Sequence, residues 1–226
     1  MAEKDDEIDP LEAQLFKEVD EELKRDRYKQ IWAKYGKYFL SGATAIVLVV
    51  AGIVWWRDHR LEVRGDEGSA YAAAATLADR GSPDAAIRAF MALAAKSDSG
   101  YKALARLHAA ALRAKKGDRR GAAALYDQVA ADGDADQILR DLALLLSVMT
   151  QLDTGKPAAL TARLAALAKG DGPWHHSALE LTALLAERSG DLKRARAIYT
   201  RLADDATAPG ALRSRAKVML EILGKS

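Results

Sequence analysis

Four glycines recur at a nearly constant spacing along the chain, and this period constrains the fold more than any other feature. Gly81, Gly117, Gly155 and Gly190 are separated by 36, 38 and 35 residues. Each follows a helix-forming stretch and suits the left-handed position that ends a helix. A capping residue or a proline comes next, as at the start of a second helix. The sequence therefore predicts about four helical hairpins that stack into a solenoid.

Small and large apolar residues recur in register with these glycines. Five positions after each glycine comes an alanine or leucine, and four positions further comes a large apolar or aromatic residue. The pairs are Ala86 and Phe90, Ala122 and Tyr126, Leu160 and Leu164, and Ala195 and Tyr199. The first helices keep a small residue at Ala74, Ala110 and Ala183, but the third unit has Val148. The pattern resembles a degenerate tetratricopeptide repeat, which implies an all-α fold. We expect residues 210–223 to form a solvating cap helix.

A run of 19 uncharged residues, from Tyr38 to Trp56, precedes the repeats. At about 1.5 Å per residue it is long enough to cross about 30 Å of hydrocarbon as a helix. Six basic residues lie just before the run and three lie just after it, which favours a cytoplasmic N-terminus. We therefore expect a cytoplasmic segment at 1–37, a transmembrane helix at 38–56, a stalk at 57–65 and a periplasmic repeat domain at 66–226.

The predicted cytoplasmic segment contains an amphipathic stretch after a disordered start. Phe16, Val19 and Leu23 share one helical face, and a basic cluster at 24–37 would meet anionic lipid headgroups. Two interpretations remain open at this stage. The segment either only sets the topology, or it also binds a partner through that face.

No arrangement of residues in the sequence predicts catalysis. The chain has no cysteine and a net charge of +2, and it lacks phosphate-binding and nucleophile motifs. His175, His176 and Glu180 are the nearest approach to a metal site, but a further ligand is not visible. We expect a protein that is not an enzyme, with no cofactor, no metal, no nucleic-acid partner and no small-molecule substrate.

The run FKEVDEELKRDRYKQIWAKYG, from Phe16 to Gly36, leads directly into the apolar run and then the degenerate repeats. This order of parts resembles the YfgM-like family. The resemblance implies an ancillary subunit of the SecYEG translocon, in a bacterial inner membrane, that works with a membrane-anchored periplasmic chaperone. A scaffold of another envelope machine, such as cell division or cell-wall assembly, has the same physical features and stays open.

Stacked helical hairpins curve, and the first helix of each unit lines the inner surface in this architecture. We expect the partner site on that concave face. Candidate contacts are Tyr71, Tyr101, Arg106, Arg140 and Trp174. Aromatic and arginine side chains carry much of the binding energy in typical interfaces. For Tyr101 and Trp174, packing between units is an equally good interpretation.

Overall fold

A computed structural model describes residues 48–57, 59, 62–98 and 100–224. The chain divides into two compact units, residues 1–62 and residues 63–226. In the first unit, residues 48–57 and 59 are helical and their large apolar side chains are exposed. Among the described residues, no helix combines the length and the apolar character needed to cross a membrane. Part of the predicted span, 38–47, and the face of Phe16, Val19 and Leu23 lie outside the described residues.

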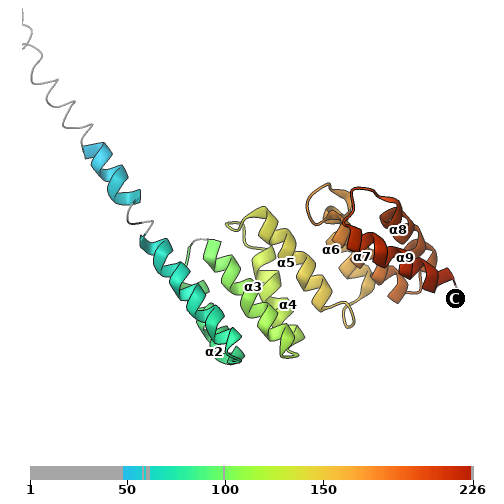
Figure 1. The fold of residues 1–226 in the computed structure, drawn as a ribbon, viewed down its shortest axis with the longest axis horizontal. Helices are drawn as coiled ribbons and strands as arrows, with labels where there is room; N and C mark the ends of the chain where they lie inside the picture. The colour runs from blue at the N-terminus through green and yellow to red at the C-terminus, as the bar shows by residue number, and fades with distance from the viewer. Residues whose placement is uncertain (1–47, 58, 60–61, 99, 225–226) are drawn as a thin grey trace, which may run out of the picture. The chain divides into compact units, whose positions relative to one another are not determined.

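The second unit consists of consecutive antiparallel helices, and its described residues include no strand (Figure 1). A helix at 62–79 precedes eight further helices. These are α2 (Pro83–Lys96), α3 (Gly100–Lys115), α4 (Arg119–Ala130), α5 (Gln137–Thr150), α6 (Pro157–Lys169), α7 (His175–Arg188), α8 (Leu192–Asp204) and α9 (Gly210–Gly224). Each helix packs on the one before it in the chain, and α5 also touches α3 and α7, as α9 touches α7. The predicted all-α repeat domain is confirmed.

Three of the four periodic glycines end a helix in the left-handed conformation. The φ angles of Gly81, Gly117 and Gly190 are 74°, 88° and 80°. A side chain at such a φ strains the backbone, so glycine is the natural residue there. The next helices start as predicted: the carboxylates of Asp118 and Asp191 accept hydrogen bonds from backbone N–H groups of α4 and α8.

Gly155 does not follow this pattern, and the prediction for its backbone was wrong. Its φ is not positive. A Cβ atom there would lie 2.8 Å from Cδ1 of Leu160 and 3.2 Å from the carbonyl oxygen of Gln151. The third turn therefore requires glycine because two neighbours approach closely, not because the chain turns left-handed.

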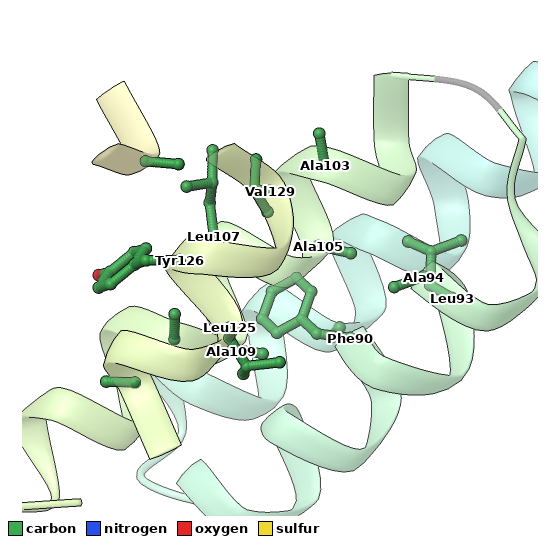
Figure 2. Packing of buried hydrophobic residues seen from close by; sticks show 14 of the residues in the cluster. Phe90, Leu93, Ala94, Ala103, Ala105, Leu107, Ala109, Leu125, Tyr126 and Val129 are labelled. Carbon is green, nitrogen blue, oxygen red and sulfur yellow. The ribbon is translucent and has the colours of Figure 1, made fainter. Parts of the chain in front are cut away.

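The small and large residues of the repeat pattern form the core. Every one of the paired positions is buried: Ala86, Phe90, Ala122, Tyr126, Leu160, Leu164, Ala195 and Tyr199. So are the tight positions of the first helices: Ala74, Ala110, Val148 and Ala183. Figure 2 shows Phe90 of α2 near Ala105 and Ala109 of α3. The alanines let neighbouring helices approach closely, and the large rings fill the spaces between them.

The core is divided into three clusters, and the divisions fall at α5 and at α7. One cluster runs from the helix at 62–79 to α5, a second joins α5, α6 and α7, and a third joins α7, α8 and α9. α5 and α6 contact each other much less than other successive helices do. Val148 replaces the usual alanine on α5, and its larger side chain suits this wider separation.

Candidate protein-interaction surface

Two of the predicted contact residues, Tyr71 and Tyr101, meet in one aromatic group on the first helices. The Tyr71 ring lies 5.7 Å from the Tyr101 ring and 5.3 Å from the rings of Phe90 and His108. Phe90 is fully buried, both tyrosines are half-buried and His108 is exposed. Burial, with a smaller effect of Tyr101, raises the pKa of the Tyr71 phenol. The group therefore presents partly exposed rings, the neutral Tyr71 phenol among them, on the buried base of Phe90.

Close packing positions the Tyr101 ring. Its hydroxyl oxygen lies 3.0 Å from where a Cβ of Gly68 would be. A side chain at position 68 would push against this hydroxyl, so glycine lets the start of α3 lie across the helix at 62–79. Tyr101 thus packs between units, as one of the two interpretations predicted, and it remains half-exposed.

Arg106 and Arg140 both hold the loop between α4 and α5. Arg106 donates to the Asp132 carboxylate at 3.0 Å. Arg140 donates to the carbonyl oxygens of Gly133 and Ala135 at 2.9 and 3.0 Å. Both guanidinium groups therefore have partners within the chain, and any external partner would compete with these contacts.

Trp174 lies away from the aromatic group, at the start of α7. Its indole Nε1–H donates to the carbonyl oxygen of Ile138 at 3.1 Å, and its ring packs on the cluster of α5, α6 and α7. The ring is nevertheless only partly buried. Tyr101 and Trp174 both open a first helix and reach back to the first helix of the preceding unit.

Several exposed residues were missed by the sequence analysis. His108 follows Tyr101 by seven positions, which places both on one face of α3, so its spacing could have revealed it. On the last helix, predicted to be solvating, Val218 is 54% exposed and Ile222 is 53% exposed. These two residues are four positions apart, which places an apolar strip on the outer surface of the cap helix.

The histidines and acidic residues considered for a metal have other partners. His176 Nε2 lies 3.0 Å from the Asp205 carboxylate, and Glu180 accepts two hydrogen bonds from Arg215 at 2.7 and 2.9 Å. No cluster of three or more potential ligands occurs in the described part of the chain.

A comparison of the chain with known protein families identifies its family. The chain matches the family described as tetratricopeptide repeat-like domain over residues 29–225, which include the whole predicted span and all of the helical hairpins. In the same comparisons it matches no curated protein and no solved structure. Since the matched region covers most of the sequence, the chain belongs to the tetratricopeptide repeat-like domain family.

Proposed function

We propose that this protein is a membrane-anchored, non-enzymatic scaffold whose repeat domain binds another protein. The observation that supports it most directly is the extended array of helical hairpins, because such arrays present long surfaces formed by successive first helices. The family match supports it further, since the matched region begins at residue 29, before the apolar run at 38–56. In this proposal the run anchors the chain, and the repeats lie in the periplasm.

The proposed partner surface lies on the first helices, centred on Tyr71, Tyr101 and His108. These rings are partly exposed and held by mutual packing, so they lose little conformational freedom on binding. Aromatic anchors of this kind carry a large share of interface energy, often about 2 kcal/mol or more each. Arg106 and Arg140 are engaged within the domain, and Trp174 lies away from these rings, at the start of α7.

The resemblance of the run from Phe16 to Gly36 supports a more specific placement. We propose that the protein is an ancillary subunit of the SecYEG translocon that links it to a membrane-anchored periplasmic chaperone. Purification of the full chain in a mild detergent, with the co-purifying proteins identified, tests this placement. Recovery of translocon subunits supports it, whereas recovery of cell-division or cell-wall proteins supports the other envelope scaffold.

The surface itself is tested by site-specific photo-crosslinking in cells. A crosslinking residue placed at Tyr71, Tyr101 or His108 should capture protein partners. The same residue at Arg88 or Arg196, both exposed on second helices, provides the matched control. Equal capture from both sets of positions would contradict a site on the first helices.

A further inference from the structure

A groove of about 250 Å³ opens where the third and fourth units meet, away from the aromatic group on the first helices. The start of α5, the end of α6 and the connection into α7 line it. Leu167, Pro173 and Trp174 give it an apolar wall. Sites for drug-sized molecules usually measure about 300–1,000 Å³. This groove is smaller and open to solvent, so it suits one large side chain of a protein partner.

The Trp174 ring is held in place before any partner arrives. Its indole N–H donates to the carbonyl oxygen of Ile138, which fixes one end of the ring against α5. The Ile138 side chain is 54% exposed beside it. A fixed aromatic wall next to an exposed aliphatic side chain is a preorganised anchor site, because little freedom remains to be lost on binding.

Two carboxylates, Asp141 and Asp171, line the groove, and neither forms an ion pair with another described residue. Asp141 accepts a hydrogen bond from the neutral amide of Gln137 at 2.6 Å. Asp171 is exposed and forms no ion pair with another described residue. The Arg140 guanidinium donates to Gly133, Ala135 and Gln137, and the Arg201 guanidinium lies 3.5 Å from Nε2 of His175, which also lines the groove. Both carboxylates therefore remain available to a positively charged partner.

The connections between units are also rich in aspartate, although Asp132 pairs with Lys102 and Arg106, and Asp205 lies against His176. The connections between units are the segments 97–99, 131–136, 170–174 and 205–209. They contain six aspartates and no basic residue: Asp98, Asp132, Asp134, Asp136, Asp171 and Asp205. Those aspartates that form no ion pair with a described residue attract a partner of the opposite sign and raise its rate of association.

We propose that this groove binds a protein segment in which a bulky apolar side chain stands beside lysine or arginine. The apolar side chain would pack against Leu167 and Trp174, and the basic group would approach Asp141 and Asp171. A cation in this position also interacts favourably with the face of an indole ring. The inference rests on the proposed scaffold function and specifies the chemistry of one class of partner.

Fluorescence anisotropy with the full chain in non-ionic detergent tests the inference. The probe is a labelled peptide, Gly-Ser-Arg-Leu-Arg-Phe-Arg-Ser-Gly. Two comparison peptides replace its arginines with glutamate, or its leucine and phenylalanine with serine. We expect saturable binding of the first peptide alone, weakening as salt screens the charges. Absence of binding, or equal binding of all three peptides, would overturn the proposal.

Variants locate the binding to the groove. Combining Asp141→Asn with Asp171→Asn should weaken binding about tenfold, since each exposed charge pair contributes up to about a fivefold effect. Asp79→Asn is the matched control, because Asp79 is exposed and lies at the end of the helix at 62–79, away from the groove lining. Trp174→Ala should weaken binding about 30-fold, with circular dichroism confirming that the helices remain. Unchanged affinity in the doubly substituted protein would refute the groove as the binding site.

The same variants separate failure of this inference from failure of the proposed function. If cellular partners co-purify equally with the wild-type chain and with the doubly substituted chain, the groove is not their binding site and the scaffold function stands. If no protein co-purifies with the wild-type chain, the scaffold function fails, and the groove proposal, which depends on it, fails as well.

Discussion

Ala122→Leu offers a direct test of how closely the repeats pack, because two physical effects would change the free energy of unfolding in opposite directions. Ala122 is 0% exposed and belongs to the same cluster as Phe90, Ala110 and Val129, which are also 0% exposed. If space were available, three added carbon atoms would each contribute about 0.8 kcal/mol of stability. If it is not, overpacking costs about 1–3 kcal/mol. The full burial of the neighbours favours the second outcome.

Ala124→Leu is the matched control, because Ala124 lies in the same helix and is exposed. The two substitutions change helix propensity equally, so their difference isolates packing. In a domain of this size, 1 kcal/mol shifts the melting temperature by about 2–4 °C. Thermal unfolding followed by circular dichroism should therefore show Ala122→Leu melting about 2–12 °C below Ala124→Leu. Equal melting temperatures, or a more stable Ala122→Leu, would refute the close-packing argument.

Gly117→Ala should destabilise by about 1–2 kcal/mol in urea unfolding, since its φ of 88° strains any side chain. Gly155→Ala should lower the free energy of unfolding by about 1–3 kcal/mol through overpacking. Replacing Leu160 with a smaller residue should restore this loss but not the loss caused by Gly117→Ala. Hydrogen bonds from the Thr207 hydroxyl and backbone N–H lower the pKa of Asp205. The ionised carboxylate therefore stabilises the folded protein at pH values above its unfolded pKa of about 3.9. Asp205→Asn should lower the melting temperature at neutral pH, and the difference from the wild-type protein should shrink as the pH falls below about 4. A periplasm-specific reporter should be active after the last residue and inactive before the first, and the reverse pattern would contradict the predicted orientation.

Most of the repeat domain was predictable from local patterns in the sequence. The cap helix predicted at 210–223 is α9, which extends one residue beyond the predicted end. Glycines, prolines and aspartates mark helix ends through backbone geometry, which depends on nearby residues alone. Burial of Ala195 and Tyr199 followed from their spacing for the same reason. Such signals survive even where a repeat has lost its consensus residues.

The roles of the candidate contact residues were less predictable, because they depend on distant partners. The carbonyl groups that Arg140 binds and the carboxylate that Arg106 binds belong to a loop whose path the sequence pattern does not define. The Trp174 ring is held by a hydrogen bond to Ile138, a residue 36 positions away, and a local sequence pattern does not reveal such a distant contact. Patterns of residue type can select side chains suited to binding, but they cannot tell whether the domain already uses them.

The third unit shows how one solenoid can accommodate a poorly matched hairpin. Ser147 is 0% exposed and donates to the Asp127 carboxylate, which also binds Arg163. These three side chains come from α5, α4 and α6, so a polar network joins α6 to the preceding unit, whereas the backbones of α5 and α6 approach each other closely at few positions. Hydrogen bonds depend on direction more strictly than apolar packing does. The network therefore fixes the position of α6 while leaving it separated from α5, and the apolar groove at Trp174 lies at the open end of the same hairpin.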